Sequence, residues 1–225
     1  MNKEISDIII NRIKEKGRTF FANENISEYL HSNELDKLET EVQEKVESLL
    51  KSLIIDTYND HNTKETAKRV AKMYIREIFK GRYFPKPKIT DFPNFKNMDE
   101  LYILGPINFK SCCSHHFVEI SGKCFIGIKP SDRVVGISKI ARIVDWIARR
   151  PNIQEEATII IADELEKLLN PVGLGVVIKS KHHCMTWRGV EEDDCNMITS
   201  VMRGDLLNNP NLKHEFFNLI NDSLK

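Results

Sequence analysis

Residues 134–169, VVGISKIARIVDWIARRPNIQEEATIIIADELEKLL, hold the clearest structural pattern of the chain. Apolar residues keep helical spacing from Ser138, a candidate N-cap, up to Pro151. A second helix, opened by Asn152–Glu155 as a capping box, runs to Asn170. Apolar strands are predicted on both sides of this helix pair, and this order indicates a mixed α+β domain.

The flanking strands are predicted at residues 117–129 and 173–188. Ser121-Gly122 divides the first apolar run and signals a hairpin there. In a strand, side chains two residues apart share a face, so His182 and Cys184 are expected to point the same way. Another helix is predicted near residues 212–224, and residues 1–56 are predicted to be helical.

Composition excludes several classes of protein. The chain has 225 residues with 33 Lys and Arg against 33 Asp and Glu, which argues against a protein that binds nucleic acid or a membrane through bulk charge. Within residues 110–188, however, Lys and Arg outnumber Asp and Glu by 12 to 8, which suits a pocket for one small anion. No apolar run approaches the roughly 18 residues of a membrane span, and the N-terminus lacks a signal-peptide core. The cytoplasm is the expected location.

Two clusters carry most of the chemistry: Cys112-Cys113-Ser114-His115-His116 and His182-His183-Cys184. They hold three of the five cysteines and four of the seven histidines, and thiolate and imidazole are preferred zinc donors. The spacing permits Cys112 with His115 or Cys113 with His116, and residue chemistry alone leaves both open. Either pair with Cys184 gives three ligands and an open position, the catalytic arrangement; a structural Cys₂His₂ site is the alternative.

Two further segments allow a functional and a plain structural interpretation. A helix that begins at Ser138 offers free N–H groups to an anion, with Lys139 and Arg142 close by, but it also fits a capped surface helix. Gln154 and Glu155 offer an amide and a carboxylate to a purine edge, although Glu155 also completes the capping box.

Taken in order, these segments resemble the GTP cyclohydrolase I family. The resemblance covers roughly two thirds of the chain and includes 65–79, 113–117, 136–139, 150–155, 182–189 and 214–216. It implies a T-fold (tunnelling fold), an α+β architecture in which helices back an antiparallel sheet. Residues 1–56 would form an N-terminal helical extension and residues 57–225 the catalytic domain. The family also implies a homodecamer with active sites between subunits.

The resemblance further implies a reaction. GTP would be hydrolysed at C8 with zinc-activated water, release formate and rearrange to 7,8-dihydroneopterin triphosphate, the first step of folate- or pterin-type biosynthesis and one-carbon metabolism. Zinc would be held by Cys113, His116 and Cys184. His115 and His182 would transfer protons, and Ser138 would lie near the ribose and triphosphate. The implied substrate-binding residues are Gln154 and Glu155 for guanine, and Lys139, Arg142, Arg188, Arg69 and Lys72 for the phosphates.

The sequence also departs from the family pattern. Ser114 stands where the family usually has Glu, Ala67 replaces a common Pro, and Cys112 adds a thiol beside a ligand. Two other hypotheses follow. One is a related T-fold purine or pterin enzyme with a different product, and the other is a catalytically silent assembly protein stabilised by zinc. No nucleic-acid or membrane partner is expected.

Overall fold

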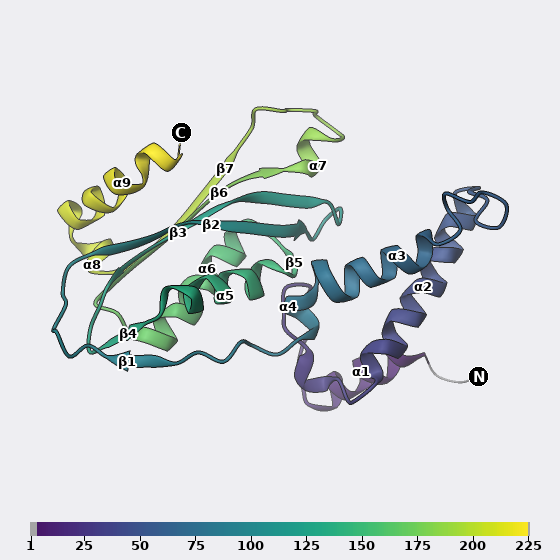
Figure 1. Cartoon of the computed structure of the whole chain (residues 1–225), viewed down its shortest axis with the longest axis horizontal. Helices are drawn as coiled ribbons and strands as arrows, with labels where there is room; N and C mark the ends of the chain where they lie inside the picture. The colour runs from purple at the N-terminus through teal and green to yellow at the C-terminus, as the bar shows by residue number, and fades with distance from the viewer. Residues whose placement is uncertain (1–3, 225) are drawn as a thin grey trace. The chain divides into compact units, whose positions relative to one another are not determined.

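A computed structural model describes residues 4–224 of the chain, which divide after Pro85 into two compact units (Figure 1). The predicted domain boundary at residue 56 stays a prediction. Among the described residues, no helix is long and apolar enough to cross a membrane.

In the described part of the first unit, every regular element is a helix, as predicted for residues 1–56. Ile9 and Ile13 of α1 pack with Ile26 in a small apolar core. Asn62 does not cap α3, because its amide donates to Asp60 and the N-cap position belongs to Glu65. The elements are α1 (Ile5–Glu15), the 3₁₀ turn η1 (Ser27–Tyr29), α2 (Glu34–Ser52), α3 (Thr66–Lys72), the π-helix η2 (Met73–Ile78) and α4 (Lys80–Tyr83).

The second unit contains a five-stranded sheet with the order β5-β2-β3-β6-β7. All neighbours are antiparallel except β2 and β5. The strands are β2 (Tyr102–Cys113), β3 (Glu119–Lys129), β5 (Pro151–Asn152), β6 (Gly173–His182) and β7 (Met197–Gly204). A separate small sheet pairs β1 (Asp91–Pro93) with β4 (Arg133–Val135). The sequence did not predict β1, β2, β5 or β7.

Helices cover both faces of this sheet (Figure 1). On one face, α5 (Ile137–Ala148) and α6 (Gln154–Leu169) bury a core that includes Phe109, Cys124 and Ile178. On the other face, α8 (Asp205–Asn208) and α9 (Pro210–Leu224) pack on Phe125 and Val177 near one end of the strands. This second core covers only one part of the face that α8 and α9 pack against.

The hairpin predicted at Ser121-Gly122 is wrong. Residues 119–129 form the single strand β3, and the chain reverses instead between β2 and β3. A Cβ atom at Gly122 would lie 2.1 Å from the backbone oxygen of Lys179 on β6. Glycine is therefore present because two strands approach closely there, and not because the chain turns.

Both predicted N-caps on the central helices are also wrong. Gly136 occupies the N-cap of α5, so Ser138 lies inside the first turn. Helix α6 begins at Gln154, and Asn152 belongs to β5. The Asn152 amide donates to the backbone oxygens of Ile147 and Ala148 at the end of α5. Asn152 thus ends one helix rather than beginning the next.

Candidate metal centre and nucleotide site

Two thiols and one imidazole converge where β2 ends. The candidate ligand atoms of Cys113, His116 and Cys184 all lie within 4.8 Å of one another. Cys113 is the last residue of β2, His116 lies in the turn that follows, and Cys184 follows β6. Of the two pairings that the spacing permits, the structure brings Cys113 and His116 together.

Backbone hydrogen bonds fix the turn that carries His116. Cys113 donates its N–H to the oxygen of Val118 at 2.8 Å, and Phe117 donates to the oxygen of Cys113 at 2.8 Å. Ser114 donates to the oxygen of Asn152 at 3.1 Å, which ties the turn to β5. Phe117 has φ of 53°, a left-handed conformation that tightens the reversal. The turn therefore holds His116 next to Cys113.

The remaining cysteines do not join this cluster. Cys112 is buried, and burial together with the neighbouring Cys113 raises the pKa of the Cys112 thiol to about 12. Cys124 lies in the core, where burial also raises its pKa, and Cys195 is exposed. Cys112 is thus kept as a neutral thiol beside the cluster.

The second half of the site differs from the predicted strand. Strand β6 ends at His182, and His183–Thr186 form the short helix α7. His182 and Cys184 therefore do not share a strand face. His183 Nε2 lies 3.2 Å from Ser121 Oγ on β3, which anchors the first residue of α7. Burial raises the pKa of the Cys184 thiol, and the nearby Cys113 raises it further.

His182 is held by Gln154. The Gln154 Nε2 atom donates to the backbone oxygens of Ile178 and Met197 and to Thr199 Oγ1, so its Oε1 atom is the acceptor. This oxygen lies 2.8 Å from His182 Nε2, which therefore carries the proton. Burial lowers the pKa of His182, whereas Glu155 acts in the opposite direction.

The other predicted site residues are less closely gathered. The His115 ring lies 6.3 Å from that of His116, and Arg188 Nη1 lies 3.2 Å from His116 Nε2. Glu155 is exposed in the first turn of α6. Ser138, Lys139 and Arg142 lie on α5.

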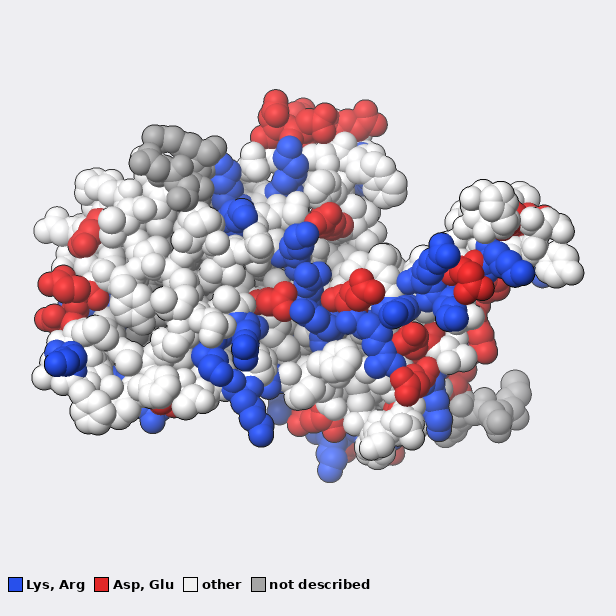
Figure 2. Space-filling view, viewed as in Figure 1, with Lys and Arg blue, Asp and Glu red and all other residues white. Residues whose placement is uncertain are grey.

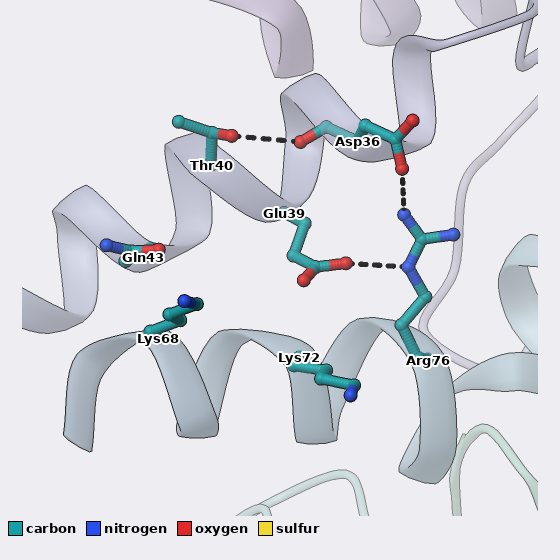
Figure 3. Close-up of a pocket in the computed structure, with 7 residues that line it drawn as sticks. All are labelled: Asp36, Glu39, Thr40, Gln43, Lys68, Lys72 and Arg76. Carbon is teal, nitrogen blue, oxygen red and sulfur yellow. Dashed lines mark hydrogen bonds and ion pairs between the residues drawn. The ribbon is translucent and has the colours of Figure 1, made fainter. Parts of the chain in front are cut away.

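Arg69 and Lys72 belong to α3 in the first unit. Lys72 lines a groove of about 510 Å³ between α2 and α3, together with Lys68 (Figure 3). At one end of this groove the Arg76 guanidinium binds the carboxylates of Asp36 and Glu39, with 2.6 Å between Arg76 Nε and Glu39 Oε2. Arg76 thereby balances the charge of Asp36 and Glu39. Because these carboxylates are already paired, Lys72 stays a candidate for binding an anion.

Sequence reasoning missed the residues that support the site. Ser180 donates to Gln154 Oε1. Beside Gln154, the hydroxyl groups of Thr158 and Thr199 form a hydrogen bond of 2.7 Å. Ser180 shares a strand face with the buried Ile178, and this alternation is the signal that places it toward α6. Nothing in the spacing indicates that Ser121 meets His183.

Fold and site together define an α+β domain with a candidate metal centre of two thiols and one imidazole. Residues 42–221 match the family model described as GTP cyclohydrolase I. The chain belongs to this family of enzymes. Because the family has the T-fold, the predicted fold class is confirmed.

Curated relatives agree over most of the chain. GTP cyclohydrolase 1 of Actinobacillus pleuropneumoniae serotype 5b is 36% identical over 187 residues, 83% of this chain and 85% of the relative. The protein of that name from Rhodopirellula baltica is 34% identical over 227 residues, 98% of this chain and 93% of the relative. A crystal structure of the archaeosine synthase QueF-Like in the apo form aligns with a TM-score of 0.37 and 15% identity, covering 53% of this chain and 97% of the other.

Proposed function

We propose that this protein is a GTP cyclohydrolase I that hydrolyses GTP at C8, releases formate and forms 7,8-dihydroneopterin triphosphate. The observation that carries the proposal is the meeting of Cys113, His116 and Cys184 within 4.8 Å in a chain of this family. No other group of three His, Cys, Asp or Glu residues in the described part of the chain has this arrangement.

The donor set fits zinc. Two thiols and an imidazole are soft and borderline donors, and three protein ligands leave one position for water or substrate. When bound there, zinc supplies a Lewis acid and acidifies water toward a pKa of about 7. Arg188 lies beside the candidate ligand His116, which is carried by the turn at 113–118.

His182 and His115 are proposed to move protons during ring opening. Gln154 fixes the His182 ring and its Nε2 proton, which leaves Nδ1 as the acceptor in the neutral tautomer. The lowered pKa of His182 favours this neutral form. His115 is exposed beside His116, where it can approach a substrate.

The nucleotide is proposed to lie across several elements. Glu155 would accept the N–H groups of the guanine edge. Ser138 would lie near the ribose, and the phosphates would be bound by Lys139, Arg142 and Arg188. Arg69 and Lys72 would contribute from a neighbouring subunit if the protein forms the homodecamer that we propose. The Gln154 amide makes its hydrogen bonds inside the chain, so we assign Gln154 to positioning His182.

A turnover assay tests the proposal. Zinc-loaded protein is incubated with GTP, formate is measured, and the product is identified by mass spectrometry and by pterin fluorescence after oxidation. We expect formate and 7,8-dihydroneopterin triphosphate in equal amounts. Loaded protein without turnover would contradict the proposal and favour a zinc-stabilised assembly protein, and another product would indicate a related T-fold enzyme.

A further inference from the structure

Ser180 is a buried hydroxyl group without a role in the proposed reaction. It lies on β6 two residues before His182, so the two side chains point to the same side of the sheet. Only 1% of Ser180 is exposed. Ser180 pairs with Gly122 on β3, where a Cβ atom would lie 2.4 Å from Ser180 Cβ. The absence of a side chain at Gly122 therefore leaves the space that Ser180 occupies.

Ser180 and His182 share one acceptor. The Ser180 hydroxyl group donates to Gln154 Oε1, and His182 Nε2 lies 2.8 Å from the same oxygen. An amide oxygen has two lone pairs, so these two donors use both of them. The two lone pairs keep a fixed angle, and a donor on one determines where the other points. The Ser180 hydroxyl group therefore helps to direct the Gln154 oxygen at His182.

The nitrogen of the same amide is fixed by backbone groups. Gln154 Nε2 donates to the backbone oxygens of Ile178 at 3.1 Å and Met197 at 3.2 Å. Exchanging the amide oxygen and nitrogen would set an oxygen against two carbonyl oxygens, which have no proton to donate. Gln154 therefore keeps Oε1 toward His182. The freedom that is left to the amide is a tilt of its plane, and the bond from Ser180 opposes this tilt.

Neutral groups make these contacts. Ser180 and Gln154 are buried, whereas the four carboxylates of residues 191–194, between α7 and β7, are exposed at the surface (Figure 2). Salt screens interactions between exposed charges but has little effect on hydrogen bonds between buried neutral groups. Any effect of Ser180 on His182 should therefore be the same at low and high ionic strength.

We propose that Ser180 is a positioning residue, which holds the Gln154 amide so that its oxygen keeps the His182 ring in one orientation. This inference rests on the proposed function, because that function makes His182 a proton carrier. A ring whose Nε2 is directed at Gln154 presents Nδ1 to a substrate. Proton transfer depends on exact placement of the two partners, so a loosened ring reacts more slowly while the substrate binds as before.

Ser180→Ala removes the hydroxyl group and leaves Gln154 and His182 in place. Thr158→Val is the matched control, because it also removes a buried hydroxyl group beside Gln154, but not one that bonds to Oε1. Both variants should lower Tm by about 2–4 °C, the effect of one buried hydrogen bond in a chain of this size. With zinc-loaded protein and GTP, we expect kcat to fall about tenfold in Ser180→Ala only, with KM unchanged.

Two results of this assay would overturn the proposal. Equal kcat values for Ser180→Ala and Thr158→Val would show that Ser180 has a purely structural role. A raised KM in Ser180→Ala alone would show that Ser180 acts on substrate binding and not on the His182 ring. A loss of kcat that disappears at high salt would equally contradict a contact between neutral groups.

Exchange of the His182 ring proton tests the positioning without turnover. In protein labelled with ¹⁵N-histidine, the Nε2–H signal of His182 is identified by its absence from His182→Ala. Its hydrogen exchange with solvent measures how often this group leaves Gln154 Oε1, and we expect about tenfold faster exchange in Ser180→Ala than in Thr158→Val. Equal exchange rates would overturn the proposal. If wild-type protein fails to turn over GTP, the proposed function fails, while this rate still decides whether Ser180 holds the ring.

Discussion

The Oε1 atom of Gln154 lies 2.8 Å from Nε2 of His182, although the two residues are 28 positions apart in sequence. Gln154 is fully buried, and both ends of its amide are bonded within the chain. This single side chain therefore joins α6, β6 and β7 and at the same time sets the orientation of a proposed proton carrier.

Replacing Gln154 with Leu should lower both stability and turnover. The change leaves several buried donors and acceptors without partners, which costs about 2–4 kcal/mol of the free energy of unfolding. It also releases His182, so kcat should fall more than KM changes. Urea denaturation and steady-state kinetics measure the two effects. Thr158→Val is the matched control, because it disturbs the same network without touching His182. A raised KM with normal stability would instead indicate that Gln154 contacts GTP.

Replacing either cysteine of the cluster should remove bound zinc. Cys113→Ser and Cys184→Ser each delete a thiolate donor, and we expect loss of both zinc and activity. His182→Ala should keep zinc and lose rate, since His182 bonds to Gln154. The zinc content of each variant, measured by mass spectrometry of the metal, tests these expectations. Cys195→Ser, which changes an exposed cysteine, is the control and should retain zinc. Zinc loss from His182→Ala would show that His182 is a ligand.

The link between His183 and Ser121 should control how firmly α7 holds Cys184. His183→Phe and Ser121→Ala each remove the 3.2 Å contact and should weaken zinc binding by about tenfold. Competition with a chelator measures this affinity, and the absorption of the cobalt-substituted protein reports the geometry of the thiolates. The double variant should be no worse than either single variant, because both break the same bond. Independent, additive losses would contradict the link.

Acid should destabilise the helical first unit through Glu34. Arg12 donates to both carboxylate oxygens of Glu34 at 2.8 Å, and this pairing lowers the pKa of Glu34 from 4.5 to about 2. A lowered pKa in the folded state means that the stabilisation is fully present above pH 4.5 and is lost as the pH falls toward 2. Glu34→Gln should cost about 1–2 kcal/mol at neutral pH and flatten this acid dependence. Thermal unfolding from pH 7 to pH 3 measures both.

Glu44→Gln is the control for the acid experiment. Glu44 is exposed on the same helix α2, so its replacement removes one carboxylate while the Arg12 pair stays intact. It should preserve the acid dependence of the wild-type protein. If Glu34→Gln and Glu44→Gln behave alike, the pairing of Arg12 with Glu34 does not govern the acid response.

The sequence predicted the helices of the second unit better than its strands. Helices α5 and α6 carry strong helical periodicity, and both were expected close to their observed limits. Strand β2 is interrupted by Gly105-Pro106, and this break hides its pattern. The change from strand β6 to helix α7 at His182 could not be predicted from the local sequence, because no Gly or Pro marks it.

The composition of the site could be predicted, but its geometry could not. Cys-Cys-Ser-His-His indicated a metal centre, yet the two pairings have identical spacing and only the three-dimensional turn at 113–118 separates them. Likewise, the sequence predicted that the Gln154 amide would bind a purine. Nothing in the neighbouring residues indicates that this amide is bonded to the backbone of β6 and β7. Long-range contacts of this kind are absent from sequence periodicity.

The pairing of β3 with β6 also bears on the order of folding. These strands align over ten residue pairs, from Ile120 with His182 to Lys129 with Gly173, and the chain between them forms β4, α5, β5 and α6. Closing so long a loop is slow compared with forming the neighbouring β2–β3 hairpin. Cys184 arrives only with β6, so a nascent chain holds Cys113 and His116 without their third partner until most of the domain has emerged from the ribosome.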